Sequence, residues 1–309
     1  MRLDITNLFQ TYIKSTGSYF NILNEYVEKD YWLFLVLKEI FSHDGGFVFK
    51  GGTSLSKCYK IIKRFSKDID VSFDENSFKS SRKKIDGFHN VIESIEKTGL
   101  VIDNKDRLRR NGYFNQFVCP YKSVFDQTRI DNKVIIELAG QSPSFPVVTK
   151  QIQPLVGEYL VAIGRDDLVS KYDLNPITIN VQSIERTFVD KLFAIFDYYL
   201  EKKCDKHSRH LYGISKLLEL IKLDSELIPL IGIVRKYRSN SSVCYSSRNG
   251  VSLSLLLAAI VEDNVYKDDY ELVTQPLLYE DYPYQRCVEN LKKIQTFYKK
   301  MICKDKGKT

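Results

Sequence analysis

Apolar side chains recur at two different periods along this chain, and the change of period divides it into two parts. Residues 1–182 mix segments of helical period with short segments in which apolar and polar positions alternate, as they do in strands. Residues 183–309 keep to the helical period. We therefore expect an α+β fold, in which helices and a mixed β-sheet (1–182) are followed by a helical domain (183–309).

The same pattern gives approximate bounds for the individual elements. Helices are expected at 3–14, 17–42, 78–97, 183–203, 207–222, 226–238, 252–264 and 284–303. Strands are expected at 47–49, 68–73, 99–104, 112–121, 130–139 and 177–181. The serine-rich stretch 239–249 ends just before Gly250 and predicts a loop.

A pair of glycines follows the first predicted strand. Gly51 and Gly52 let the chain turn sharply and let a ligand approach the backbone. Thr53 or Ser54 can cap the helix that begins there, and its start favours a phosphate, although most Gly-Gly turns merely end a strand. The apolar positions of this helix share one face and should contact a core: Leu55, Cys58, Tyr59 and Ile62.

The next predicted strand carries two carboxylates on one face. From Asp68 to Phe73 the residues alternate strictly, so Asp68 and Asp70 point one way while the apolar side chains between them point the other. Two carboxylates at this spacing can hold Mg²⁺, which takes carboxylates, waters and substrate phosphates. An isolated Asp-x-Asp more often belongs to an exposed polar strand face. Here the preceding glycine turn and helix favour a metal site that works on a nucleoside triphosphate.

At these residues the chain resembles a known family. The central pattern runs from Lys50-Gly51-Gly52-Thr53-Ser54-Leu55 to Arg64-x-Ser66-x-Asp68-Ile69-Asp70. It is similar to that of the AbiEii/AbiGii-type nucleotidyltransferase toxins, the toxin halves of bacterial abortive-infection toxin–antitoxin systems. Two flanking motifs support the likeness, which covers roughly residues 25–215: Glu28-Lys29-Asp30-Tyr31-Trp32 and Glu185-Arg186-Thr187-Phe188-x-x-Lys191.

The resemblance implies a fold, an activity and two partners. The fold is a nucleotidyltransferase-like palm with N-terminal helices, followed by a C-terminal helical lobe. The activity is transfer of a nucleotide from an NTP to an acceptor hydroxyl with Mg²⁺ or Mn²⁺, and the acceptor it points to is RNA, tRNA above all. In this role, which belongs to phage defence, the added nucleotides stop translation. The second partner is a cognate antitoxin, typically a winged-helix DNA-binding regulator.

A third acid is needed for two-metal chemistry, and the family places one on a neighbouring strand. Glu137 lies in the otherwise apolar strand 134–138, where a carboxylate needs a cation or donors nearby. We expect it to complete the metal site and to accept the proton of the attacking hydroxyl. An edge position or a structural ion pair are the alternatives.

Cations and hydroxyls near the motif are expected to bind the triphosphate. Lys50 and Arg64 can neutralise its charge or form salt bridges with the nearby acids, and Ser66 can donate to a phosphate oxygen or cap a turn. Lys191 matches the lysine with which the family holds the triphosphate, although its spacing alone would suit an ordinary surface lysine. The expected NTP contacts are Lys50, Gly51, Gly52, Thr53, Ser54, Arg64, Ser66 and Lys191.

The family pattern breaks at one position. After residues 209–212 the family has an acid, whereas this chain has Gly213, which costs about 1 kcal/mol inside a helix relative to alanine. Either this chain dispenses with the acid, with Asp205 or Glu219 as substitutes, or its activity is impaired. His207 and His210 lie three residues apart without a third soft ligand, so we interpret them as packing or RNA-facing residues.

Composition adds a compartment and a class of partner. The 309 residues are 43% hydrophobic and 28% charged, which is ordinary for a globular protein with a sizeable core. Six scattered cysteines without a Cys-x-x-Cys pair predict free thiols in the cytoplasm, and no segment suits a membrane span or a secretory signal. The net charge of +7 fits binding to a polyanion, and basic residues cluster at 57–67, 82–84, 105–110, 202–209 and 299–300, which would equally suit solvated helix faces.

These observations favour a Mg²⁺-dependent nucleotidyltransferase toxin that acts on RNA, and they leave three alternatives open. The first is transfer of a nucleotide to a protein side chain. The second is a catalytically silent nucleotide- or RNA-binding module, which Gly213 favours. The third is a metal-dependent phosphohydrolase.

Overall fold

The computed structural model describes residues 1–64, 68–109, 114–126 and 128–306. Its contacts group the chain into two compact units. The first comprises Met1–Cys58 and Ser66–Val181, and the second comprises Tyr59–Phe65 and Gln182–Thr309. The two domains expected from the sequence stay a prediction, and each unit is described here by itself.

Within the described residues, the first unit contains a mixed sheet of six strands in the order β3-β4-β2-β1-β6-β5. Its strands are β1 (Phe47–Lys50), β2 (Asp68–Phe73), β3 (Phe114–Pro120), β4 (Lys133–Ala139), β5 (Val147–Ile152) and β6 (Ile177–Gln182). β2 pairs antiparallel with β1 and parallel with β4, while β1 also pairs parallel with β6. This mixed pairing, with helices before and beside the sheet, confirms the predicted α+β class.

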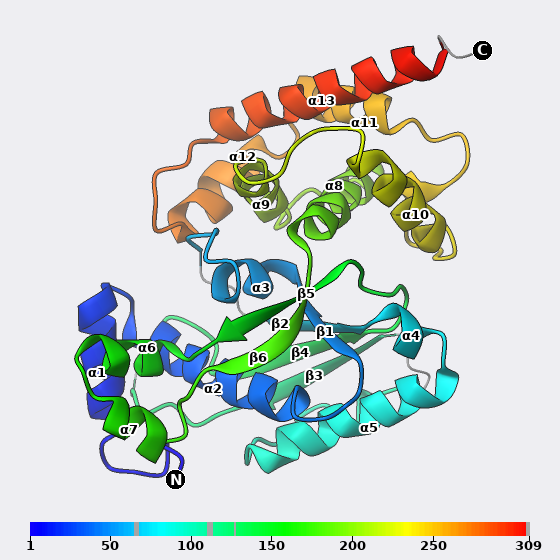
Figure 1. Cartoon of the computed structure of the whole chain (residues 1–309). Coiled ribbons are helices and arrows are strands. Elements are labelled where there is room, and N and C mark those ends of the chain that lie inside the picture. Colours follow the sequence, from blue (N-terminus) through cyan, green and yellow to red (C-terminus); the bar gives the residue numbers. More distant parts are fainter. Residues whose placement is uncertain (65–67, 110–113, 127, 307–309) are drawn as a thin grey trace. The chain divides into compact units, whose positions relative to one another are not determined.

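The described residues of the first unit also form helices. They are α1 (Phe9–Phe20), α2 (Asn24–Ile40), α3 (Gly51–Lys57), α4 (Glu75–Phe78), α5 (Ser81–Lys97), α6 (Leu155–Ala162) and α7 (Asp166–Lys171). Figure 1 shows α2 and α5 running along the same side of the sheet. α5 comes close to it at Gly87, where a Cβ would lie 2.5 Å from the Phe73 ring. Ile69, Val71 and Phe73 of β2 are fully buried beneath these helices.

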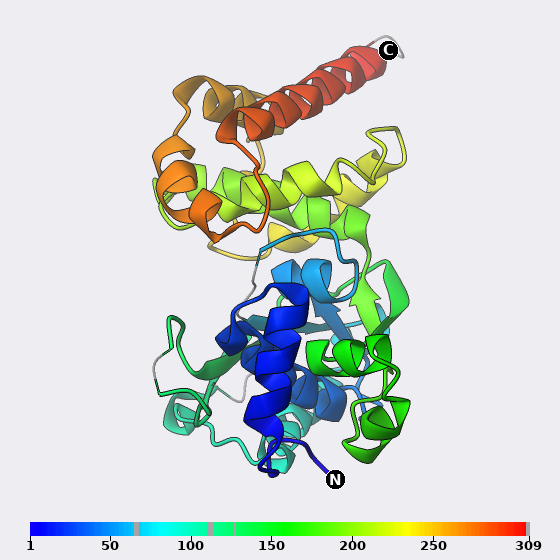
Figure 2. The same cartoon turned by 90° about the vertical axis from the view of Figure 1, so that its left-hand side faces the viewer.

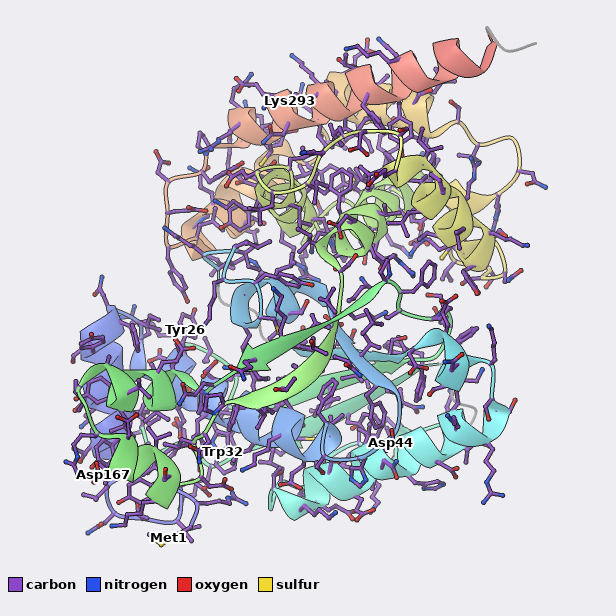
Figure 3. The ribbon with its side chains drawn as sticks, in the orientation of Figure 1. Met1, Tyr26, Trp32, Asp44, Asp167 and Lys293 are labelled. Atoms are coloured by element: carbon purple, nitrogen blue, oxygen red, sulfur yellow. The ribbon has the colours of Figure 1, made fainter. Side chains whose placement is uncertain are left out.

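The motif Glu28–Trp32 on α2 contacts several other elements of the first unit. The buried Glu28 carboxylate accepts hydrogen bonds from Ser123 Oγ (2.6 Å) and from the Val124 N–H (2.9 Å). Asp30 accepts the N–H of Leu155 at the start of α6 (2.7 Å) and pairs with Lys57 Nζ on α3 (2.5 Å). Trp32, labelled in Figure 3, stacks on Tyr121 with ring centroids 5.6 Å apart. This family motif therefore contributes to the fold by joining α2 to α3, α6 and the segment after β3.

The Asp30–Lys57 pair gives a stability prediction. Only 6% of the Lys57 side chain and 13% of the Asp30 side chain is exposed. Lys57→Met leaves the carboxylate buried without its cation, so we expect the free energy of unfolding to fall by about 3–5 kcal/mol, measured by urea denaturation. The more exposed pair of Lys38 with Asp173 is the control, and Lys38→Met should cost at most about 1 kcal/mol. Equal losses in the two variants would contradict a special role for the buried pair.

Several expected elements of the first unit are wrong or were missed. The expected strand at 99–104 does not form. Leu100 and Ile102 are buried, as their apolar character predicts, but the backbone hydrogen bond of this segment to β3 is a single one, from Asp103 N to Val118 O, among those of the described residues. The strand β5 and the helices α6 and α7 were not predicted. β5 lies at the sheet edge and is mostly exposed, so its sequence carries little alternation. The first two helices begin later than expected, and the left-handed Asn21 (φ 53°) ends α1 before α2 begins at Asn24.

The second unit is helical, as the sequence predicts. Its α-helices are α8 (Ile184–Leu200), α9 (Arg209–Leu217), α10 (Leu227–Arg238), α11 (Leu253–Asp263), α12 (Lys267–Asp269) and α13 (Tyr284–Lys306). Figure 2 shows α13, which carries the Lys293 labelled in Figure 3, as a long helix along the outer side of this unit. α9 packs against α8, and α11 packs against α13. None of the helices among the described residues has the length and apolarity that crossing a bilayer requires.

The segment after α3 belongs to the helical unit. The N–H of Lys63 donates to Tyr212 Oη on α9 (2.8 Å), and the N–H of Tyr279 donates to the Lys63 carbonyl (2.8 Å). Arg64 forms an isolated bridge with Leu278. Lys63 and Arg64 are thereby held by α9 and by residues 278–279, which come more than 140 residues later in the chain.

Candidate active site

A row of polar side chains crosses four strands of the sheet. The register places Lys50 of β1 opposite Asp70 of β2, Asp70 opposite Glu137 of β4, and Glu137 opposite Gln116 of β3. Residues directly opposite one another on neighbouring strands project from the same face of a sheet. Gln116 Nε2 donates a hydrogen bond to Glu137 Oε1 (2.9 Å). A cation, two carboxylates and an amide therefore lie side by side on this face.

The strand β2 holds its two aspartates as the alternation predicts. Asp68 and Asp70 are half-buried, while Ile69 and Val71 between and after them are fully buried on the other face. Asp68 lies opposite Ile135, not Glu137, so the third acid is the neighbour of Asp70. The oxygen atoms of these carboxylates are the hard donors that Mg²⁺ prefers, and Mg²⁺ completes its shell with waters and phosphates.

These acids do not form a finished cage for a metal ion. Over the described part of the chain, no three His, Cys, Asp or Glu side chains are arranged so that they could hold a metal together. The donor set fits a divalent ion that keeps several waters and substrate oxygens, and it does not fit a dedicated all-protein site.

Gly51 lies directly against one of the aspartates. Its φ of +75° is in the left-handed region, which side chains rarely adopt. A Cβ at this position would collide with the Asp70 carboxylate oxygen Oδ2. The glycine therefore lets the backbone at the end of β1 approach the acidic face, while the approach of a ligand to this turn stays a prediction.

The hydroxyls of Thr53 and Ser54 do not act as expected. Thr53 Oγ1 donates to the Asp68 carbonyl, and Ser54 Oγ donates to the Gly51 carbonyl (2.9 Å). The cap position of α3 is Lys50, without a side-chain cap, so the capping prediction is wrong. Thr53 instead ties α3 to β2, because a buried hydroxyl needs a hydrogen-bond partner and the Asp68 carbonyl accepts from it. The helix also ends at Lys57, before the expected Cys58, Tyr59 and Ile62.

In the second unit, two of the cations expected to bind the triphosphate lie near the same histidine. Arg64 and Lys191 both interact electrostatically with His210 on α9. Lys191 lies on α8, next to Gly213 of α9, where an added Cβ would be 2.9 Å from Lys191 Cε and 3.2 Å from Nζ. The departure from the family pattern therefore falls beside Lys191, and an acid at position 213 would reach its ammonium.

His210 on α9 and His207, just before that helix, both stack on an aromatic ring of α8. His207 stacks on Tyr198 of α8 with ring centroids 3.5 Å apart, and His210 stacks on the same tyrosine at 5.8 Å. Both ring nitrogens of His210 are buried without a hydrogen-bond partner among the described residues. Burial above all, and then the charges of Lys191, Arg209, His207 and Arg64, lowers the pKa of His210 well below its usual value. The histidines thus fit the packing interpretation.

The lowered pKa of His210 predicts how stability depends on pH. Below about pH 6.5 the unfolded chain takes up a proton at this residue that the folded chain does not, so unfolding becomes easier as the pH falls. We expect the urea midpoint to decrease from pH 7 to pH 5. His210→Phe, which keeps a ring beside Tyr198, should reduce that decrease, whereas substitution of the exposed His89 by Gln should leave it unchanged. A pH profile of His210→Phe equal to that of the unchanged chain would refute this account.

The remaining expected residues are placed as follows. Ser66 lies outside the described residues. Glu219 forms ion pairs with Lys216 (3.0 Å) and Arg286 (3.2 Å), and Asp205 is exposed between α8 and α9. Their roles, like those of the expected NTP contacts, stay predictions.

Sequence reasoning missed two groups of supporting residues. One is Gln116, whose partner Glu137 is found only through the strand register. The other is Asp190 with Gln182: the Asp190 carboxylate pairs with the buried Arg186 of the flanking motif (3.1 Å) and accepts a hydrogen bond from Gln182 (3.0 Å). The i,i+4 spacing of Arg186 and Asp190 on a predicted helix was an available signal for this second group.

Comparison with known proteins adds family information to this geometry. The family model described as "Nucleotidyl transferase AbiEii toxin, Type IV TA system" matches residues 36–293. Among solved structures, the chain is similar to MenT4, the nucleotidyltransferase toxin Rv2826c from Mycobacterium tuberculosis H37Rv, at 17% identity and a TM-score of 0.46, over 88% of this chain and 82% of that one. It is also similar to a proposed nucleotidyltransferase from H. pylori at 14% identity and a TM-score of 0.43, over 90% and 97% of the two chains. A search of curated proteins gave no match.

Proposed function

The chain belongs to the AbiEii nucleotidyltransferase toxin family of type IV toxin–antitoxin systems, and on that premise we propose that it transfers a nucleoside monophosphate from an NTP to RNA, with tRNA as the favoured acceptor and Mg²⁺ as the metal. It is a nucleotidyltransferase enzyme, and its family implies a cognate antitoxin. We propose that this antitoxin is a DNA-binding regulator and that the reaction takes place in the cytoplasm.

One observation supports the proposal most directly. The carboxylates of Asp70 and Glu137 lie side by side on the sheet, with the glycine turn at Gly51 against Asp70. Nucleotide transfer needs acids that hold metal ions, because these ions bind the phosphate oxygens of the substrate. It also needs a neighbouring turn of the backbone that leaves room for the substrate. In this proposal Asp68, Asp70 and Glu137 would each supply ligands to divalent ions whose shells are completed by water and the triphosphate, and these ions would supply Lewis-acid stabilisation of the phosphate charge.

The chemical roles follow from charge and position. The acceptor hydroxyl oxygen forms a bond to the α-phosphorus, and the bond from that phosphorus to the bridging oxygen breaks, so that pyrophosphate leaves. Glu137 accepts the hydroxyl proton. Lys50, Arg64 and Lys191 neutralise triphosphate charge, and catalysis is mostly positioning and electrostatic stabilisation. The backbone of residues 51–54 is the proposed phosphate cradle, together with Ser66.

A single labelling experiment tests the proposal. Each of the four NTPs, labelled at the α-phosphate, is incubated with the protein, Mg²⁺, total RNA and total protein. We expect label on RNA, and 3′-end sequencing of that RNA should identify the acceptor. Label on protein would instead support nucleotidylation of a side chain, and released nucleotide or phosphate without transfer would support a phosphohydrolase.

A second candidate function, a silent nucleotide- or RNA-binding module, is favoured by Gly213. If the acid that the family carries is required, this chain binds NTP without transferring it. In that case Gly213→Asp, which places a carboxylate beside Lys191, should create transfer that the unchanged chain lacks. Under the main proposal the unchanged chain already transfers label, and the variant alters only the apparent affinity for NTP.

A further inference from the structure

A pocket in the helical unit is lined by residues that the proposed reaction does not use. Its volume is about 570 Å³, and its lining consists of Leu200, Glu201, Lys203, Tyr245, Arg248 and Val251. Sites for small ligands usually enclose about 300–1,000 Å³. The lining combines an aromatic ring, two cations and one carboxylate, which is the set of groups that a nucleotide can engage at its base and at its phosphate.

The loop that forms one wall of this pocket is held in place by buried polar contacts. Arg235 on α10 donates to the carbonyls of Arg248 (2.9 Å) and Val251 (2.6 Å). The buried Asp197 accepts the N–H of Ser246 (2.7 Å) and pairs with Arg238 (2.6 Å). These bonds fix the serine-rich loop that the sequence predicts and that the transfer reaction does not explain. The pocket wall is therefore preformed, and a ligand need not order it.

A stacking platform lies on this wall. The guanidinium carbon of Arg248 lies 4.2 Å from the centre of the Tyr245 ring, and Arg248 Nη2 donates to the Ser242 carbonyl (2.9 Å). Arg248 is exposed, whereas Tyr245 is half-buried beneath it. Unpaired RNA bases stack on aromatic rings and on guanidinium planes, so this pair offers a base a flat cationic surface.

The pocket lining also carries a pair of opposite charges. Lys203 Nζ lies 3.0 Å from Glu201, and the side chains are 69% and 18% exposed, respectively. The ammonium end of this pair is exposed, so Lys203 can exchange its partner at a modest cost. Lys203 can therefore turn to a phosphate, while the Glu201 carboxylate accepts hydrogen bonds from the amino group of a base. Lys202 and Lys206 are exposed in the same short segment of the chain as Lys203, and several cations in one segment suit a strand of several phosphates better than a free mononucleotide.

We propose that this pocket binds an unpaired nucleotide of a single-stranded RNA segment, with the base stacked on the Arg248 guanidinium, which Tyr245 supports from below, and with the backbone at Lys203. The inference rests on the proposed function in one respect, which is that it takes the RNA to be the acceptor of the transferred nucleotide. It assigns the acceptor a binding point outside the residues that handle the NTP.

The test measures RNA binding without the reaction. Full-length protein is titrated into a fluorescein-labelled single-stranded RNA of mixed sequence, about 15 nucleotides long, without NTP or metal, and anisotropy is followed at several salt concentrations. Arg248→Gln keeps the carbonyl that Arg235 binds, and it should weaken binding about tenfold. Lys203→Gln should lower the slope of log Kd against log salt by about 0.7. Lys236→Gln, which removes an exposed lysine outside the pocket lining, should change neither quantity by as much.

The outcomes separate this inference from the proposed function. If the unchanged chain labels RNA with NTP while both pocket variants bind RNA as it does, the inference is overturned and the proposed function stands. If the pocket variants lose RNA binding while no chain labels RNA, the pocket is supported and transfer to RNA fails. Where both are right, Arg248→Gln should raise the KM for RNA and leave kcat unchanged. A Lys236→Gln effect as large as that of Lys203→Gln would show general charge attraction and would also overturn the inference.

Discussion

Asp70→Asn should reduce nucleotide transfer at least about 1,000-fold while the protein stays folded. Asp70 lies at the centre of the polar row, between Lys50 and Glu137 on the neighbouring strands. Replacing its carboxylate by an amide keeps the size of the side chain and removes the charge that a divalent ion needs. Metal assistance stabilises a phosphoryl-transfer transition state by several kcal/mol, and each 1.36 kcal/mol is a factor of ten in rate. The measurement is the initial rate of label transfer from the α-labelled NTP at saturating Mg²⁺.

The control for this substitution is a matched change on an exposed aspartate. Asp106→Asn alters a side chain that is 79% exposed in the short helical turn after α5, and it should leave transfer unchanged. Thermal unfolding of both variants shows whether the fold persists. Transfer by Asp70→Asn within tenfold of the unchanged chain would eliminate the metal-binding role of this carboxylate, whatever happens with the other acids.

Local patterns predicted what the strand β2 does, because alternation is a property of neighbouring residues. Asp68 and Asp70 share a face since the strand repeats every two residues, and no distant contact is needed to foresee it. The sequence also identifies Glu137 as the acid of another strand, because it interrupts an apolar run. Its alignment with Asp70 depends on the register of the two strands. Register is set by packing between strands more than 60 residues apart, so a one-residue slip would have turned Glu137 to the other face.

The failures arise where a side chain finds a partner far away in the chain. Thr53 looks like a cap because its sequence neighbours begin a helix, yet its hydroxyl donates to the Asp68 carbonyl on β2. Lys57 looks like a solvated lysine in a basic cluster, yet it is buried against Asp30, which precedes it by 27 residues. The flanking motif around Asp30 supports the resemblance to the family, but its pattern does not show which side chains it contacts. In the structure Glu28 and Asp30 are buried, and their partners are Ser123, Val124, Lys57 and Leu155.

Gly51→Ala should lower nucleotide transfer by at least about 100-fold, through steric overlap with Asp70. The added Cβ would collide with the Asp70 carboxylate, so either the aspartate or the turn must move. A displacement of about 1 Å at a reacting group is enough for a loss of this size. The left-handed φ of +75° adds backbone strain of roughly 1 kcal/mol to the free energy of folding. The measurements are the rate of label transfer and the urea midpoint of the same preparation.

Gly164→Ala separates strain from collision. Gly164 has a φ of +72°, close to that of Gly51, but nothing lies within 4 Å of the position that its Cβ would take. Both variants should therefore lose a similar amount of stability from backbone strain, and only Gly51→Ala should lose transfer per folded molecule. If the two variants lost transfer equally, the effect would come from stability alone, and the close approach of the glycine turn to Asp70 would have no part in the reaction. Full transfer by Gly51→Ala would contradict the proposal, because it would show that the position of the Asp70 carboxylate does not matter for the reaction.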